Sequence, residues 1–207
     1  MGDRDLRGAP VQRDAAKTRQ LLLEAARRRF ARDGYAATTV RDIADDVGVN
    51  AALISRYFGS KGDLFAACLE GAVQDLGRSA DKVQGLPQMV EAISRHAVGI
   101  TPEGVPGQVL LLLLRSSGDE HAEQKRLAVL RSFASKIASV AGWTPNQPGA
   151  EEVLLRAQVV LSVAVGIAAL RLSGVQPLGS ATERELVGPL LDMATALLGR
   201  QPSLLEE

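Results

Sequence analysis

Side chains that could act as nucleophiles, general bases or metal ligands are few in this 207-residue sequence and lie far apart. There is one cysteine, Cys68, and there are two histidines, His96 and His121. A Cys/His zinc site needs about four such ligands, and a single cysteine excludes an internal disulfide. No Gly-rich phosphate loop or paired-carboxylate motif completes a convergent catalytic set. We therefore expect no enzymatic activity, no metal site and no cofactor.

Residues suited to contacting DNA occur together in the N-terminal third. The hydroxyl of Ser55 can bond to a base or a phosphate, and Arg56 can pair with guanine or phosphate. The small neighbours Ala51 and Ala52 would let the backbone approach closely. Two basic residues, Arg41 and Lys61, lie in the first turns of the flanking helices, from which they could reach phosphates. The free backbone N–H groups of those first turns also attract the negative charge of a phosphate.

The surrounding residues predict two short helices joined by a tight turn. Thr39 and Asp42 have the spacing of a capping box, and Gly48 is placed to end the first helix. Asn50 is a strong N-cap for a second helix over about 51–58. This is a helix-turn-helix unit, and in DNA-binding proteins its second helix lies in the major groove. On spacing alone, plain helix packing is the alternative.

The rest of the sequence also predicts helices, and no alternating strand pattern occurs. A first helix should run from Asp14 to about Gly34. Beyond the helix-turn-helix, helices are expected from Lys61, over about 87–99, from Pro106, and over about 119–141, 151–172 and 182–198. The predicted fold class is all-α.

Over residues 14–66 the chain resembles the N-terminal domain of the TetR family of one-component transcriptional regulators. The residues that carry the resemblance are Thr18-Arg19, Leu22-Leu23-Glu24-Ala25-Ala26, Phe30-Ala31, Gly34-Tyr35, Thr38-Thr39-Val40-Arg41-Asp42-Ile43-Ala44, Val47-Gly48-Val49-Asn50, Tyr57-Phe58-Gly59-Ser60-Lys61 and Leu64-Phe65. Many positions agree in order and spacing across four helices, which makes the resemblance specific.

The resemblance implies a three-helix DNA-binding head followed by an all-helical ligand-binding and dimerisation domain. It implies a homodimer that binds a pseudo-palindromic double-stranded DNA operator and is released by a small-molecule effector. We expect a repressor, with an activator as the alternative. The expected domains are a flexible arm over 1–13, the head over 14–60 and the sensor over 61–207. The expected DNA-binding residues are Thr39, Arg41, Asn50, Ala51, Ala52, Ser55, Arg56, Tyr57 and Lys61.

Two positions depart from the family's usual pattern. Ser55 stands where the family often has a tyrosine that touches phosphate or base, so that contact could shift to Tyr57 or Arg56. Arg29 stands where the family prefers an apolar residue. We expect the stem of Arg29 to cover apolar surface while its charged head reaches water.

The C-terminal two thirds match the family in being helical and of suitable length. The helix over about 151–172 is apolar nearly all round, and Ser162 and Gly166 have a spacing that permits close helix approach. We expect it to form the homodimer together with the helix over 182–198. The alternative is a central helix in a monomeric bundle. Candidate ligand-binding residues, for which plain core packing is the alternative, are Met89, His96, Phe133 and Trp143. The apolar composition of 86–172 suggests a hydrophobic effector.

The charges cancel over the whole chain but not within its parts. Residues 1–65 hold 12 basic and 9 acidic residues, and residues 66–207 hold 12 and 15. The N-terminus has no secretory signal pattern, and the longest charge-free runs have 14 residues, fewer than a membrane span needs. We expect a cytoplasmic protein without a membrane partner. A helical enzyme and a protein-interaction scaffold that kept the head are the competing functions.

Overall fold

The structure, a computed structural model, describes residues 9–80, 84–101 and 104–199, with side chains from residue 14 and none over 71–80. The described residues form helices and no strand, which confirms the all-α fold class. The helices are α1 (Ala9–Asp33), α2 (Val40–Val47), α3 (Ala52–Phe58), α4 (Lys61–Ala80), α5 (Leu86–Val98), α6 (Val105–Leu114), α7 (Glu120–Val140), α8 (Ala150–Leu172) and α9 (Glu183–Leu198).

Most helix starts are set by side chains that bond to the free N–H groups of the first turn. Thr39 and Asp42 form the predicted capping box at the start of α2, and Thr182 and Glu185 form another at the start of α9. At the start of α7, the side chain of Asp119 accepts from the N–H of Ala122. These short-range bonds explain why the predicted starts of α2, α7 and α9 agree with the structure to within a residue.

The first helix begins earlier than predicted. We expected a flexible arm over 1–13, but α1 begins at Ala9, so that residues 9–13 are helical. Pro10 lies in the first turn, where a missing N–H group is tolerated, and alanine and glutamine favour helix. The remainder of the predicted arm, residues 1–8, lies outside the described residues.

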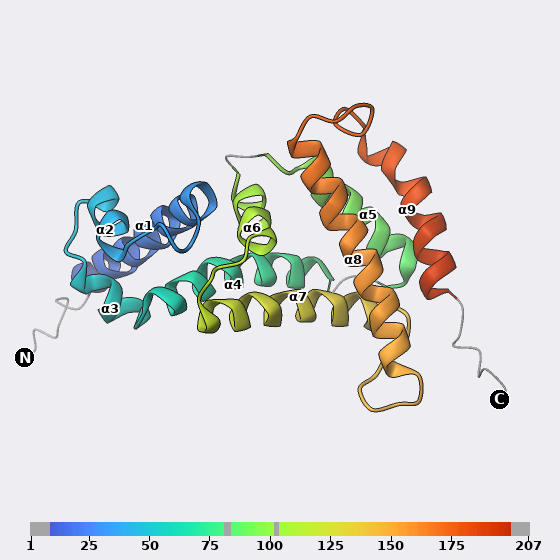
Figure 1. The fold of residues 1–207 in the computed structure, drawn as a ribbon, viewed down its shortest axis with the longest axis horizontal. Coiled ribbons are helices and arrows are strands. Elements are labelled where there is room, and N and C mark those ends of the chain that lie inside the picture. The colour runs from blue at the N-terminus through green and yellow to red at the C-terminus, as the bar shows by residue number, and fades with distance from the viewer. Residues whose placement is uncertain (1–8, 81–83, 102–103, 200–207) are drawn as a thin grey trace, which may run out of the picture.

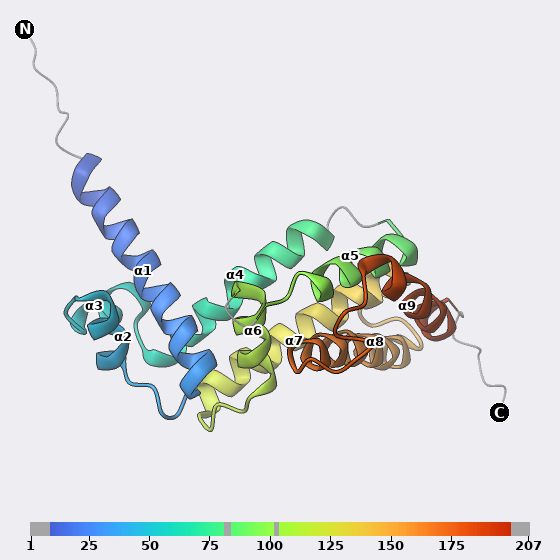
Figure 2. The ribbon, with the colours of Figure 1, turned by 90° about the horizontal axis from the view of Figure 1, so that it is seen from above.

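The helices are arranged as two ends joined by a pair of long helices. Helices α1, α2 and α3 gather at the N-terminal end, whereas α5, α8 and α9 gather at the other (Figures 1 and 2). Between them α4 packs along α7, and α6 lies beside α1 and α4. Among the described helices, the main contacts of α1, α2 and α3 outside their own group are therefore with α4 and α6, which in turn pack against α7.

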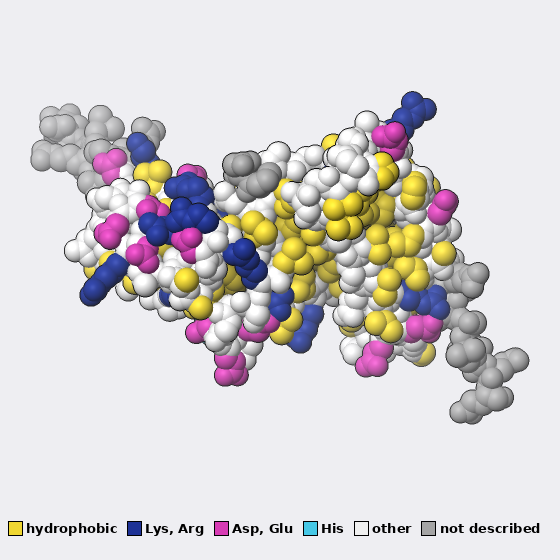
Figure 3. All heavy atoms as spheres, turned by 45° about the horizontal axis from the view of Figure 1, so that its top comes forward, with side chains coloured by type: hydrophobic (Ala, Val, Ile, Leu, Met, Phe, Trp, Pro, Cys, Tyr) yellow, Lys and Arg dark blue, Asp and Glu magenta, His cyan; other side chains and the backbone are white. Residues whose placement is uncertain are grey.

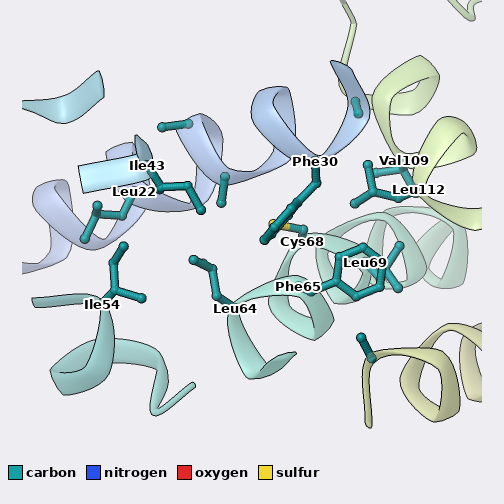
Figure 4. Packing of buried hydrophobic residues seen from close by; sticks show 14 of the residues in the cluster. Leu22, Phe30, Ile43, Ile54, Leu64, Phe65, Cys68, Leu69, Val109 and Leu112 are labelled. Atoms are coloured by element: carbon teal, nitrogen blue, oxygen red, sulfur yellow. The ribbon is translucent and has the colours of Figure 1, made fainter. Parts of the chain in front are cut away.

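Two apolar cores hold this arrangement together. The first fills the space between α1, α2, α3 and α4, where Leu22, Ile43 and Ile54 point toward one another (Figure 4). It continues into α6 and α7 through Val109 and Phe133. The second core lies between α5, α7, α8 and α9. The head is thus packed directly onto the helices that lead to the second core.

Helix α8 is long and apolar enough to cross a membrane when judged by length and composition alone. The prediction of no such segment rested on charge-free runs, which Arg156 interrupts, but the helix itself spans 23 residues. In the structure α8 packs against α5, α6, α7 and α9. Three large apolar side chains on it are exposed, namely Leu155, Val159 and Leu170. The single chain therefore leaves one apolar face of α8 uncovered.

Candidate nucleic-acid interface

The turn between α2 and α3 is built by a left-handed glycine. Gly48 has φ 72°, its N–H donates to the carbonyl of Asp45 at 3.1 Å, and the N–H of Val49 donates to that of Ala44 at 3.0 Å. This pair of bonds closes a helix end where the chain reverses. Glycine fits because other residues meet a steric cost at that backbone angle. The tight helix-turn-helix predicted from the sequence is therefore present.

The second helix of the unit, α3, is fixed at its start and along its inner side. The side-chain oxygen of Asn50 accepts from the N–H of Ala52 at 2.8 Å, which is the cap that the sequence predicted. Ile54 is buried in the first core with 1% of its surface exposed. A buried anchor on one side of so short a helix turns its opposite side to solvent.

The outer side of α3 presents small and basic residues. Ala52, Ser55 and Arg56 are exposed, and the guanidinium of Arg56 pairs with no other residue of the described chain. Ala51 and Tyr57 are half-buried and pack against the first core. Of the nine predicted DNA-binding residues, Ala52, Ser55 and Arg56 are thus exposed on α3, whereas Ala51 and Tyr57 also take part in folding.

Basic side chains flank α3 on the neighbouring helices. Arg41, on the first turn of α2, is exposed and has no partner among the described residues. Thr39 is exposed, but its hydroxyl group is engaged with Asp42. The ammonium group of Lys61 lies 4.2 Å from the centre of the Tyr35 ring, and burial lowers the pKa of Lys61. Lys61 therefore begins α4 in contact with an aromatic ring rather than fully in water.

Arg19 is a basic residue beside α3 that the predicted set of DNA contacts did not include. Its guanidinium lies 4.9 Å from the centre of the Phe58 ring, at the end of α3, and the residue is exposed. Such a cation–π contact holds a positive charge against the last turn of the helix. The two residues lie on separate helices, so periodicity within either helix gives no signal for the contact.

Arg29 does not simply extend into water as the sequence suggested. Its Nε donates to one carboxylate oxygen of Asp46 at 2.7 Å and its terminal nitrogen donates to the other at 2.6 Å. The hydrogen bond from Arg29 lowers the pKa of Asp46. Arg29 thus connects α1 to the end of α2 through an ion pair, whereas an apolar residue at this position would connect them by packing.

Charge and apolar surface are distributed unevenly on the face drawn in Figure 3. Basic and acidic side chains both gather over the N-terminal end, and hydrophobic side chains gather over the middle and the C-terminal part. The acidic side chains at the N-terminal end include partners of arginines, such as Asp33 beside Arg32 and Asp46 beside Arg29. The guanidinium groups of Arg41 and Arg56 take part in no ion pair within the described chain, so they remain available to a polyanion.

A cavity of about 230 Å³ lies in the distal part, between α5, α6, α7 and α8. Three of the candidate ligand-binding residues line it, namely Met89, His96 and Phe133. Trp143 is not among the lining residues, because it follows the end of α7 and its indole N–H donates to the carbonyl of Ala150 at 2.9 Å. Trp143 anchors the loop before α8 against the second core instead.

Polar contacts join the helices around the cavity to α1 of the head and to the start of α4. Arg115, directly after α6, donates to the carbonyl of Ala31 at 3.0 Å and more weakly to that of Arg32 at 3.3 Å. On α7, His121 lies 3.1 Å from a carboxylate oxygen of Asp63 on the first turn of α4. A shift of α6 or α7 would therefore reach the base of the head.

Comparison with known proteins places the head in a family. Residues 22–68 match the bacterial regulatory proteins of the tetR family. The HTH-type transcriptional repressor SCO4008 of Streptomyces coelicolor is 39% identical over 77 residues, which are 35% of this chain and 40% of that repressor. The matched segments span between 40% and 57% of the first curated relatives. These relatives are transcriptional regulators and not enzymes.

Solved structures resemble the fold over nearly the whole chain. NalD of Pseudomonas aeruginosa, described as the secondary repressor of the MexAB-OprM multidrug efflux pump, has a TM-score of 0.66 at 18% identity, covering 89% of this chain and 97% of NalD. The complex of SmeT with triclosan has a TM-score of 0.65 at 19% identity, covering 92% of this chain and all of SmeT. With its four-helix pattern and its tight turn, the N-terminal part of this chain matches the bacterial regulatory proteins of the tetR family over residues 22–68, and these solved structures share its fold.

Proposed function

We propose that this protein is a ligand-responsive homodimeric transcriptional repressor that acts in the cytoplasm. It binds a pseudo-palindromic DNA operator and leaves it when a small-molecule effector binds the distal helices. The observation that carries the proposal is the outer side of α3, where Ser55 and the unpaired Arg56 are exposed opposite the buried Ile54. The matched relative SCO4008, a transcriptional repressor, supports it.

In this proposal α3 enters the major groove and its neighbours bind the backbone. Ala51 and Ala52 allow a close approach, Ser55 and Arg56 contact base edges or phosphates, and Tyr57 supports them from the half-buried side. Contacts to phosphates position the head and carry most of the salt dependence. We assign such contacts to Thr39, Arg41, Asn50 and Lys61, all at or beside helix starts.

The second element of the proposal is a homodimer formed through α8 and α9. The uncovered face of α8 carries Leu155 and Val159, which are 60% and 43% exposed. A Cβ atom built at Gly166 on α8 or at Gly188 on α9 would meet nothing within 4 Å. The open space beside these two glycines would let the same helix pair of a second copy approach closely. Burial of the exposed apolar side chains of α8 would then supply the free energy of dimerisation. A second copy, rather than lipid, then covers α8.

The third element is release by an effector bound in the cavity. Met89, His96 and Phe133 would contact it, and the SmeT–triclosan complex supports an apolar ligand. Helices α6 and α7 form part of the cavity wall; Arg115, directly after α6, contacts the head at Ala31, and His121 on α7 contacts Asp63 at the start of α4. An effector that displaces these helices would change the spacing of the two recognition helices. The proposed domains are a head that begins with α1 and ends at residue 60, and a sensor over 61–207.

The experiment measures binding to the DNA upstream of the protein's own gene. Fluorescence anisotropy with a labelled duplex of that region is compared with a shuffled duplex of equal length and composition, at several salt concentrations. The proposal predicts tighter binding to the upstream duplex at every concentration, with an affinity that falls linearly on a log–log plot against salt. Equal affinity for both duplexes throughout would reject the regulator.

A further inference from the structure

The walls of the distal cavity are apolar apart from two side chains on facing helices. His96 lines the cavity from α5 and Lys136 lines it from α7. The other lining side chains belong to alanine, valine, leucine, isoleucine, methionine, phenylalanine and proline. No aspartate or glutamate of the described chain contributes to the lining. The cavity therefore combines an apolar wall with one fixed positive charge.

No side chain in the described part of the chain neutralises the charge of Lys136. The positions one turn away on α7 are Ser132, Phe133, Ser139 and Val140, none of which can form an ion pair. The ammonium group forms no ion pair with any residue of the described chain, and the residue is half-buried. An anion beside an ammonium group that is partly shielded from water is held by a charge-assisted hydrogen bond. A cationic ligand would be repelled at the same place.

We propose that the effector is a small amphipathic acid whose anionic head group pairs with Lys136 while its apolar body fills the cavity. This inference rests on the proposed function, because it names the effector class of that sensor cavity. A cavity of about 230 Å³ is smaller than those that hold drug-sized ligands and suits a short alkyl chain. An unbranched acid of about eight carbons is therefore a suitable probe, with His96 as a second polar group on the opposite wall.

The test compares three probes that share one apolar chain and differ in the head group. Calorimetry at neutral pH measures sodium octanoate, octan-1-ol and octylamine on the full chain. Octanoate should bind at least about tenfold more tightly than octan-1-ol, and octylamine should bind weakest. Equal binding of octanoate and octan-1-ol, tighter binding of octylamine, or no binding of octanoate would each overturn the assignment.

Substitutions separate the charge of Lys136 from its packing. Lys136→Met keeps an apolar stem of similar length, so it should bind octan-1-ol as the wild type does and lose the preference for octanoate. Lys136→Arg should keep the preference. Lys125→Met is the matched control, since Lys125 is on the same helix and does not line the cavity. A Lys136→Met variant that keeps the preference contradicts the role of Lys136.

Binding to the upstream duplex distinguishes this inference from the proposed function. All three variants should bind the duplex like the wild type, and octanoate should release the wild type but not Lys136→Met. If none of the proteins binds the duplex but the preference for octanoate is intact, the proposed regulator function is rejected and the proposed acid-binding site stands. Normal duplex binding that octanoate does not reverse rejects the acid as effector and leaves the regulator.

Discussion

Arg29 of α1 and Asp46 of α2 form a two-point ion pair that joins the first helix of the chain to the helix-turn-helix. Two nitrogens of the guanidinium reach the two carboxylate oxygens at 2.7 and 2.6 Å. Both side chains are about a third exposed or less. Because Asp46 lies in the last turn of α2 beside Gly48, the pair holds the helix at the point where the chain reverses.

The ion pair should make the head sensitive to acid. The hydrogen bond from Arg29 lowers the pKa of Asp46, so the folded state holds this proton less readily than the unfolded chain. The stabilisation is therefore present above the unfolded pKa of about 3.9 and is lost as the pH falls through the lower folded value. Asp46→Asn should lower the thermal midpoint at neutral pH, and its difference from the wild type should shrink as the pH falls through the folded pKa of Asp46. Asp45→Asn on the same helix is the control. An equal loss for both variants at neutral pH would contradict the pairing.

Gly48 should be replaceable only by a residue that tolerates a left-handed backbone. A Cβ atom there would meet nothing within 4 Å, so the cost of Gly48→Ala comes from its φ of 72° rather than from a clash. We expect a loss of about 1 kcal/mol in the free energy of unfolding, measured by urea denaturation. Gly48→Asn should lose less, since asparagine adopts this conformation more readily. A similar loss in both variants would point to packing instead.

Local signals explain why most of the helix boundaries could be predicted. Capping boxes at Thr39 and Thr182 and the left-handed Gly48 each act over a few residues, so spacing alone reveals them. The start of α1 was predicted five residues too late, because the polar composition of the arm hid a helix that alanine and Pro10 permit. Termini carry weaker periodicity than helix interiors, and boundaries there are the least certain feature of a sequence.

Contacts between distant segments account for what the sequence did not reveal. The partners Arg29 with Asp46 and Arg19 with Phe58 lie on separate helices, and only the packing of those helices brings them together. Met89, His96 and Phe133 could be named as ligand-lining residues from composition, whereas Lys136 could not. A lysine in an amphipathic helix resembles any solvated residue until the opposing helices show that it borders a cavity.

Cys68 should behave as a core residue rather than a redox sensor. It is 1% exposed, and burial raises the pKa of its thiol to about 12. At neutral pH the thiolate, which is the reactive form, is scarce. An aromatic disulfide reagent should therefore label the folded protein far more slowly than the protein in urea. Labelling of the folded chain at the rate of the unfolded one would contradict this burial.

The uncovered face of α8 should control assembly. Leu155→Glu places a charge on a side chain that is 60% exposed in the single chain, so it should spare folding and weaken the dimer. Leu127→Glu, on an exposed position of α7, is the matched control. Light scattering after size-exclusion chromatography should show a dimer for the wild type and the control, and monomer for Leu155→Glu. If all three proteins were dimers, the exposed face of α8 would not be part of the dimer interface.

The central claim is that α3 reads DNA, and the affinity of Arg56→Ala for the upstream duplex tests it most directly. Arg56 is exposed and unpaired, so its removal should leave the fold and the dimer unchanged. Losing a base or phosphate contact should weaken binding by about 1–3 kcal/mol, which is about 5- to 150-fold. Arg131→Ala removes an equally exposed arginine from α7 and should bind like the wild type. Arg56→Ala binding the duplex as tightly as Arg131→Ala does would contradict the account.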